Sequence, residues 1–340
     1  MKKYAIALVA LASIGSAFGA DPSAVTIYGK VDIGLKSSTT TGGVNQGLVP
    51  ATGSYEGDRI GFKGETDIGA GLKAGFQLEG AFGGDGTLAK ANMLFSRVTK
   101  GYIAGSFGTV SAGKDWSPYD SAFNDSLEYN GFSAMGNAWY AGAHGDNGTT
   151  GGGNPANALQ YATPDFGGFN AVVMYAPGQD KTSTTDATSY TGLGLNYVKG
   201  PVAINFAYET KKNYQNAVVV QGVTTNAWIL ATSYDLGVAK VFAGAEQADT
   251  GSTGKDSGYE LGLSVPVTKE IMLGLGYATE TTQVSGQTDG KATSFGLQAV
   301  YTLTPKAAFY AGYNTTDTTP SLTQVKSTTS YYATGFRYNF

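Results

Sequence analysis

The sequence contains few charged side chains, and eight of them form a group that could act on ions and polar solutes. Charged residues make up only 14% of the 340 residues. The candidates are four bases within 59–114 and four acids within 115–128. The bases are Arg59, Lys63, Arg97 and Lys114, and the acids are Asp115, Asp120, Asp125 and Glu128. Opposed charges that line one narrow space set up a transverse field, which orients dipolar solutes and discriminates between ions.

Bond-making chemistry has little support in the sequence. The chain has no Cys, which removes thiolate nucleophiles, disulfides and Cys-ligated metals together. Nucleophilic catalysis needs a base beside the nucleophile, and the single His, His144, lies next to a Gly-rich stretch without a Ser motif beside it. No acidic cluster has the spacing of a calcium loop, and no Gly-rich phosphate cradle opens a helix. We therefore expect a protein that is not an enzyme and uses no cofactor and no metal.

The segments that carry the bases have the alternating pattern of β-strands. In residues 25–35 most apolar side chains occupy odd positions, whereas Lys30 and Asp32 occupy even positions. Because successive side chains of a strand point to opposite faces, this alternation predicts one face in an apolar medium and one in water. The pattern recurs in about sixteen segments of about ten residues, the length that a tilted membrane-crossing strand needs. Arg59 and Arg97 fall on the polar positions of their segments, and so does Lys63.

The connections between these segments alternate in length. Turns such as 67–71 and 234–237 are short, whereas 37–57 and 211–224 are long and polar. Short turns on one side and long loops on the other are typical of outer-membrane barrels, and only a closed barrel satisfies every backbone hydrogen bond in lipid. We therefore predict an all-β protein, a transmembrane antiparallel β-barrel of about 16 strands with short periplasmic turns and long extracellular loops. A soluble β-sandwich also alternates, but aromatic residues gather near strand ends here, as in 331–340.

The first residues have the pattern of a cleaved secretory signal peptide. Two lysines precede a short apolar run, and small residues then satisfy the small-x-small rule for cleavage. We predict that residues 1–19 are removed and that the mature chain begins at Ala20, with Asp21 as the alternative start. Residues 20–340 then form one barrel domain with 20 basic and 26 acidic residues. This net charge of −6 gives no reason to expect nucleic-acid binding.

Short motifs along the whole chain are similar to those of a known family. They are VTIYGKVDIG at 25–34, DRIGFKGE at 58–65, FSR at 95–97, FGTV at 107–110 and YATPDFGGF at 161–169. With these motifs in this order, the chain resembles the general porins of Gram-negative outer membranes, in the branch typical of β-proteobacteria. The terminal Phe340 resembles the C-terminal aromatic residue that the barrel-assembly machinery reads in that family.

The resemblance implies a water-filled channel, usually a homotrimer, that passes ions and small hydrophilic solutes across the outer membrane of a Gram-negative bacterium. In that family the third extracellular loop folds into the lumen, and the corresponding segment here is about 115–155. Its acids would face basic residues of the wall and set the selectivity. The family commonly has Arg where this chain has Lys114 and Gln160, so we expect weak selectivity, leaning towards cations. The expected partners are outer-membrane lipid, lipopolysaccharide and the barrel-assembly machinery.

Three other functions are compatible with parts of the pattern. A substrate-specific outer-membrane channel of the same fold could use the loop aromatics Tyr119, Tyr129 and Trp139 as a sliding surface for one class of solute. A barrel lipase or protease would need a base beside its nucleophile, and no motif provides this pair. A plugged structural barrel is the expectation for eight strands, whereas about sixteen leave an aqueous channel. Passive diffusion through an open barrel is therefore the function that the sequence favours.

Overall fold

The computed structural model describes most of the chain beyond its first residues. The described ranges are 25–43, 45–84, 86–88, 93–126, 153–215, 218–251 and 254–340. The predicted signal peptide of residues 1–19, the predicted mature start and Glu128 lie outside these ranges, as does most of the predicted constriction loop. Within the described ranges, no helix is long and apolar enough to cross a membrane.

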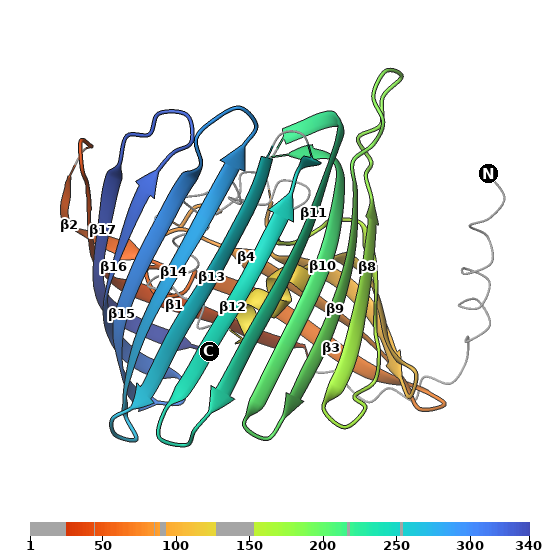
Figure 1. Cartoon of the computed structure of the whole chain (residues 1–340). Helices are drawn as coiled ribbons and strands as arrows, with labels where there is room; N and C mark the ends of the chain where they lie inside the picture. Colours follow the sequence, from red (N-terminus) through yellow and green to blue (C-terminus); the bar gives the residue numbers. More distant parts are fainter. Residues whose placement is uncertain are drawn as a thin grey trace.

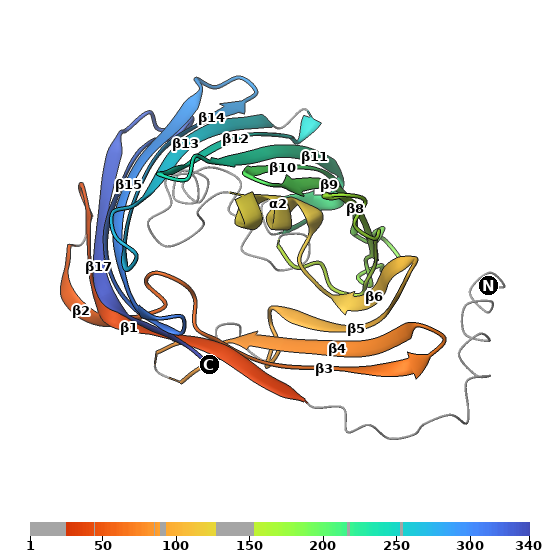
Figure 2. The same cartoon turned by 90° about the horizontal axis from the view of Figure 1, so that it is seen from below.

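Seventeen strands of the described residues form one antiparallel sheet that closes on itself (Figure 1, Figure 2). The strands are β1 (Thr26–Thr40), β2 (Gln46–Thr52), β3 (Arg59–Gly69), β4 (Leu72–Ala81), β5 (Val98–Gly105), β6 (Gly108–Lys114), β7 (Ala158–Ala162), β8 (Phe169–Pro177), β9 (Ser189–Lys199), β10 (Val202–Gln215), β11 (Val218–Asp235), β12 (Lys240–Asp249), β13 (Gly254–Pro266), β14 (Ile271–Val284), β15 (Gly290–Thr304), β16 (Ala307–Thr319) and β17 (Ser327–Asn339).

The strand β1 closes the barrel. From β3 to β17 each strand pairs with the next one in the chain. β1 pairs with β17 along one edge, and with β3 along the other. β2 is an additional strand, which pairs with β1 beyond the end of β3. The predicted closed barrel of about 16 strands is therefore confirmed.

The outer face of the barrel is apolar and its inner face is polar. In β1, Ile27 and Ile33 point outward and are 58% and 57% exposed. Lys30 and Asp32 lie on the opposite face and are 8% and 0% exposed. Apolar side chains are stable on the outside only where lipid replaces water, so this inverted arrangement fits a membrane barrel. The period-2 alternation predicted for this segment is confirmed.

The wall of the barrel is low on one side. β5, β6 and β7 have 8, 7 and 5 residues, whereas β9 to β17 have between 10 and 18. A tilted strand needs about 9–11 residues to cross the hydrocarbon core of a membrane. The three strands, which we call the low wall, are therefore too short to face lipid across its full thickness.

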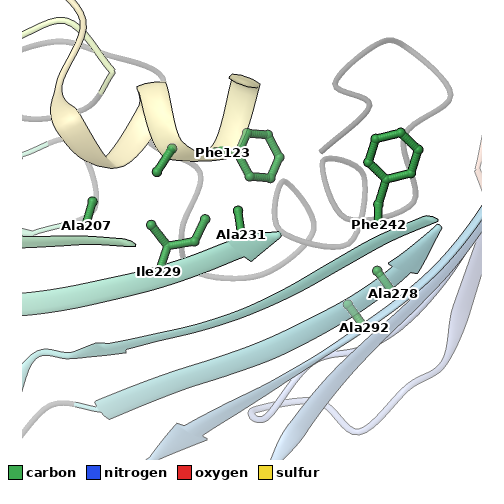
Figure 3. Packing of buried hydrophobic residues seen from close by; sticks show 8 residues of the cluster. Phe123, Ala207, Ile229, Ala231, Phe242, Ala278 and Ala292 are labelled. Carbon is green, nitrogen blue, oxygen red and sulfur yellow. The ribbon is translucent and has the colours of Figure 1, made fainter. Parts of the chain in front are cut away.

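The helix α2 (Pro118–Ser126) lies inside the barrel against β9, β10 and β11 (Figure 2). Its start is capped, because the N–H of Asp120 donates to the Ser117 hydroxyl oxygen at 3.0 Å and that hydroxyl donates to the Asp120 carboxylate at 2.7 Å. Proline also suits the first position of a helix. The buried side of α2 forms one apolar cluster with the wall, shown in Figure 3. Its buried members are Ala122, Phe123, Ala207, Ile229, Ala231, Phe242, Ala278 and Ala292.

Glycines bring the two strands of the β1–β17 seam close together. Gly34 pairs with Gly335, and a Cβ atom on Gly34 would overlap with the carbonyl oxygen of Thr334. Phe340 extends the seam, because its N–H donates to the carbonyl oxygen of Gly29 at 3.1 Å and its own carbonyl accepts from the Gly29 N–H at 3.2 Å. The last residue of the described chain is therefore part of the barrel closure. Its role as an assembly signal remains a prediction.

Replacing Gly34 with Ala should destabilise the closed barrel, because the added methyl group requires the strands of the seam to separate. We expect a loss of about 1–3 kcal/mol, the usual cost of overpacking. The measurement is the midpoint of heat unfolding, read from the mobility shift of the folded barrel in gel electrophoresis. Gly47→Ala is the control, since a Cβ atom there meets no heavy atom within 4 Å. Equal midpoints for both variants would contradict the role assigned to the seam.

Candidate functional site

Four cations gather on the inner wall near the seam of the barrel. Lys30 in β1 lies directly across from Arg59 in β3, and Arg337 in β17 lies across from Asp32. The charges of Arg337 and of Arg97, which precedes β5, both act on Arg59. We call Lys30, Arg59, Arg97 and Arg337 the basic patch. Like charges at such close range destabilise a sheet unless acids compensate them.

Two carboxylates compensate most of the basic patch. Glu56 forms an ion pair with Lys30 and a second one with Arg337, whose Nη1 lies 3.0 Å from the Glu56 Oε2. Glu79 in β4 pairs with Arg97, with 2.5 Å between its Oε1 and the arginine Nε. Glu79 is only 6% exposed, so its charge is directed at the patch rather than at bulk water. Three of the four cations are therefore held in ion pairs.

Arg59 differs from the other three cations of the basic patch. Among the described residues it makes no ion pair, and its Nη1 donates to the carbonyl oxygen of Gly57 at 3.3 Å. Arg59 and Arg97 were predicted from the sequence to line the pore, whereas neither of the nearby carboxylates was. Glu79 has a signal in the sequence, since it occupies a polar position of its alternating segment. Glu56 has none, because it belongs to a long polar connection of the kind expected outside the barrel.

Residues 53–58, which we call the inner strap, fold against the inner wall. The Asp32 carboxylate accepts hydrogen bonds from the N–H of Tyr55 at 2.7 Å and of Glu56 at 2.9 Å. It also accepts one from the Tyr310 hydroxyl at 2.6 Å. The Tyr55 ring stacks on the Tyr310 ring, with 5.0 Å between their centroids. The inner strap thereby carries the Glu56 carboxylate to the basic patch.

The backbone of Asp32 also holds the inner strap at both of its ends. Its carbonyl oxygen accepts from the N–H of Gly53 at 2.9 Å, and its N–H donates to the Asp58 carboxylate at 2.6 Å. Burial raises the pKa of the Asp58 carboxyl, and the hydrogen bond from the Asp32 N–H opposes that shift. Asp32 of β1 therefore contacts the strap at both of its ends and in its middle.

The predicted constriction loop begins and ends at one place on the wall. The Lys114 ammonium donates to the carbonyl oxygen of Asn154 at 2.5 Å. The N–H of Ser117 donates to the carbonyl oxygen of Gly153 at 2.7 Å. We call these four residues the loop neck. Lys114, which we predicted to line the pore, thus makes a structural contact at the base of the loop.

The predicted loop acids have partners of their own where the structure describes them. Asp115 accepts a hydrogen bond from the Lys100 ammonium at 2.7 Å, and it is only 7% exposed. Asp120 belongs to the cap of α2. The side chain of Asp125 and the whole of Glu128 lie outside the described part of the chain.

Trp116 connects the start of the loop to the basic patch. The Arg97 guanidinium lies over the Trp116 ring, 4.9 Å from its centroid, which is close enough for a cation–π interaction. Lys63, four residues beyond Arg59 on β3, lies over the Tyr28 ring at 5.4 Å instead. Of the predicted bases, the structure therefore brings together Arg59 and Arg97.

A buried hydrogen bond ties α2 to the wall behind it. The Tyr119 hydroxyl donates to the carboxylate of Glu246 in β12. Burial, followed by the charge of Glu246, raises the pKa of the Tyr119 phenol well above its ordinary value, so the hydroxyl keeps the proton that it donates. Within the described ranges, no group of three or more His, Cys, Asp or Glu side chains could hold a metal ion. The hydrogen bond between Tyr119 and Glu246 holds α2 against the wall.

A closed barrel of about sixteen strands with an apolar outer face and a charged interior encloses an aqueous channel across a membrane. Comparison with known proteins gives the family. Residues 5–321 match the family model described as Gram-negative porin, so the chain belongs to the Gram-negative porin family. The resemblance predicted from the sequence motifs is confirmed. The chain is thus an outer-membrane porin, a passive channel rather than an enzyme.

Named relatives cover most of the chain. The chain is 34% identical to outer membrane porin protein 32 of Delftia acidovorans over 325 residues, which cover 91% of this chain and 88% of that protein. It is 28% identical to an outer membrane porin protein of Bordetella pertussis over 306 residues, which cover 78% of this chain and 74% of that protein. These names confirm the predicted location in the outer membrane.

Solved structures share the fold. An anion-selective porin from Comamonas acidovorans superposes with a TM-score of 0.78 at 28% identity, covering 94% of this chain and all of that chain. A trimer form of OmpT from Vibrio cholerae superposes with a TM-score of 0.70 over 94% of this chain, and its 17% identity shows the fold alone.

Replacing Asp32 with Ala should release the inner strap, because the donors of Tyr55, Glu56 and Tyr310 lose their shared acceptor. Each buried hydrogen-bonding group that is left without a partner costs about 1–3 kcal/mol of folding free energy. We expect the remaining contacts of the short strap to be too few to offset this loss. We expect a larger single-channel conductance with stronger fluctuation. Asp235→Ala, which removes only the turn contact to the Gly237 N–H, is the control. An unchanged conductance for Asp32→Ala would show that the strap is held by other contacts.

Proposed function

We propose that this porin is a general diffusion channel with weak ion selectivity. Its narrowest zone lies between the basic patch with the inner strap on one side and the loop 115–155 with α2 on the other. The observation that carries the proposal is the neutralisation of the basic patch, in which Glu56 and Glu79 pair with three of the four cations. Paired charges act on a passing ion mainly as dipoles, so neither sign of ion is strongly favoured.

The selecting field has two contributions in this proposal. Arg59 attracts anions, since it is the patch cation without an ion pair among the described residues. The predicted loop acids supply the opposing negative charge in this proposal, and the charge of Asp115 is partly compensated by its ion pair with Lys100. The similar Comamonas protein is named as anion-selective. The carboxylates of Glu56 and Glu79 are the features that would keep this chain from a strong anion preference.

Two substitutions of opposite sign test the selectivity. Glu56→Gln leaves Lys30 and Arg337 without their carboxylate and should raise the anion-to-cation permeability ratio about two- to fivefold, since one unscreened charge acts with about 0.5–1 kcal/mol. Arg59→Ser should lower this ratio by a similar factor. The measurement is the zero-current potential of refolded protein in a planar bilayer across a potassium chloride gradient.

The control for both variants is Glu270→Gln, since Glu270 lies in a short turn between β13 and β14, outside the barrel zone under test. A strongly anion-selective channel before any substitution would overturn weak selectivity. Saturation or block by one particular solute would instead support a substrate-specific channel of the same fold.

We further propose that the channel is a homotrimer in which the low wall is covered by neighbouring copies. The support is the length of β5, β6 and β7, whose 8, 7 and 5 residues leave backbone exposed at membrane depth unless protein covers it. The trimer form of OmpT has the same fold.

Introducing a charge on the low wall should therefore separate the copies. Val110→Lys places an ammonium group in the proposed contact, and we expect monomers in mild detergent by light scattering. Tyr301→Lys is the matched control, because Tyr301 is also outward-facing near the periplasmic end of its strand but lies on the tall side of the barrel. Trimers of the Val110→Lys variant would argue against an interface at the low wall.

A further inference from the structure

The inner strap lies on the inside of the β1–β17 seam and contacts both sides of it. On the β1 side it is held by the hydrogen bonds described above. On the other side, the Tyr331 hydroxyl of β17 donates to the carbonyl oxygen of Ser54 at 3.3 Å. The Glu56 carboxylate binds one cation from each side, Lys30 of β1 and Arg337 of β17. The strap therefore bridges the first and the last strand of the barrel.

A small apolar core lies between the strap and the last strands. The strap connects β2 with β3, and both of these strands pair with β1. Its Tyr55 side chain is buried on the other side of the seam, against residues of β15, β16 and β17. These residues are Val300, Ala308, Tyr310 and Ala333. A segment attached to the N-terminal side of the seam thus buries its aromatic ring on the C-terminal side.

Tyr310 crosses the seam over a glycine. It lies opposite Gly335 in the pairing of β16 with β17, and Gly335 lies opposite Gly34 of β1. A Cβ atom on Gly335 would lie only 2.5 Å from the Tyr310 hydroxyl oxygen, so the tyrosine side chain passes directly over this glycine. The hydroxyl donates to the Asp32 carboxylate of β1 at 2.6 Å. One side chain therefore joins β16 to β1 across the whole width of β17.

The seam itself has a weak point near its middle. In the register of β1 with β17, which runs from Lys30 to Thr40, Gly34 faces Gly335. Cross-strand pairs of side chains stabilise a sheet, and two glycines form no such pair. Glycine inside a strand also weakens it, because it loses more conformational freedom on folding than other residues do. The contacts of the strap on the inner side of the seam supply what this pair lacks.

We propose that the inner strap and Tyr310 form a lock that keeps the seam closed, which we call the seam lock. Separation of β1 from β17 has to break the hydrogen bond between Tyr310 and Asp32 as well as the backbone ladder. It also has to break the ion pair between Glu56 and Arg337 and to expose Tyr55. The seam lock is thus a role of the strap that is separate from its effect on the field in the channel.

A reversible covalent link across the seam tests the seam lock. Thr40 of β1 pairs with Thr329 of β17, and their hydroxyl oxygens lie 3.1 Å apart. The chain has no Cys, so Thr40→Cys together with Thr329→Cys introduces one disulfide, which holds the seam when oxidised and releases it when reduced. The measurement is the rate of heat unfolding of the refolded protein, read from the gel mobility of the folded barrel. The disulfide alone should slow this unfolding.

Tyr310→Phe, made in this cysteine pair, keeps the ring and removes the hydrogen bond that crosses the seam. In the reduced form we expect unfolding to be about tenfold faster, because a hydrogen bond to a charged acceptor is lost from the folded state. In the oxidised form the rate should equal that of the cysteine pair alone, since the disulfide holds the seam instead. Tyr331→Phe removes a longer contact of the strap and should give a smaller change with the same dependence on the disulfide.

Tyr102→Phe is the matched control. The Tyr102 ring of β5 lies over Gly75 of β4, and its hydroxyl donates to the Glu65 carboxylate of β3 at 3.0 Å, so it repeats the arrangement away from the seam. Its loss should change the unfolding rate by the same factor in both forms. An acceleration by Tyr310→Phe that persists in the oxidised form would overturn the seam lock, because the hydrogen bond would then stabilise the barrel independently of the seam. An unchanged rate in the reduced form would overturn it as well.

Discussion

Every backbone N–H and C=O group at membrane depth must find its partner within the protein, and the rest of this structure depends on that constraint. It excludes a free strand edge in lipid, so the first strand has to meet the last. β1 meets β17 on one side and β3 on the other, and its upper part takes β2 as well. Small residues such as Gly34 and Gly335 let the strands of the seam approach. The closed sheet then separates an outer face for lipid from an inner face for water.

The inner face carries buried charges, and these need compensation of their own. Asp32 is fully buried, and it is stabilised by hydrogen bonds from the inner strap and from Tyr310. The strap in turn delivers Glu56 to Lys30 and Arg337. A structural requirement on β1 therefore also determines the electrostatics of the channel. On the opposite side of the barrel, contacts with the wall also position an inner segment. There α2 is held by apolar packing and by the Tyr119–Glu246 hydrogen bond.

Period-2 alternation made the strands, the barrel and the inward direction of Arg59 predictable, because it is a local property that lipid and water impose on every strand. Glu79 obeys the same rule and could have been selected. Glu56 could not, since its position depends on a connection that folds inward through contacts with strands far away in the sequence. The contact of Lys114 with the carbonyl oxygen of Asn154 was also not predictable, because it depends on where the chain returns to the wall. The role of Lys114 in the pore stays a prediction.

The loop neck has a consequence for how such channels diverge. Lys114 and Ser117 at the start of the loop are joined to Asn154 and Gly153 at its end. The two ends of the loop are therefore attached to the barrel at one place, and this attachment does not depend on the number of residues between them. The entropic cost of a longer connection also grows only slowly with its length. Insertions, deletions and exchanges between related sequences can accumulate there without changing strand pairing. The neck therefore allows the segment between Ser117 and Gly153 to be replaced as a module.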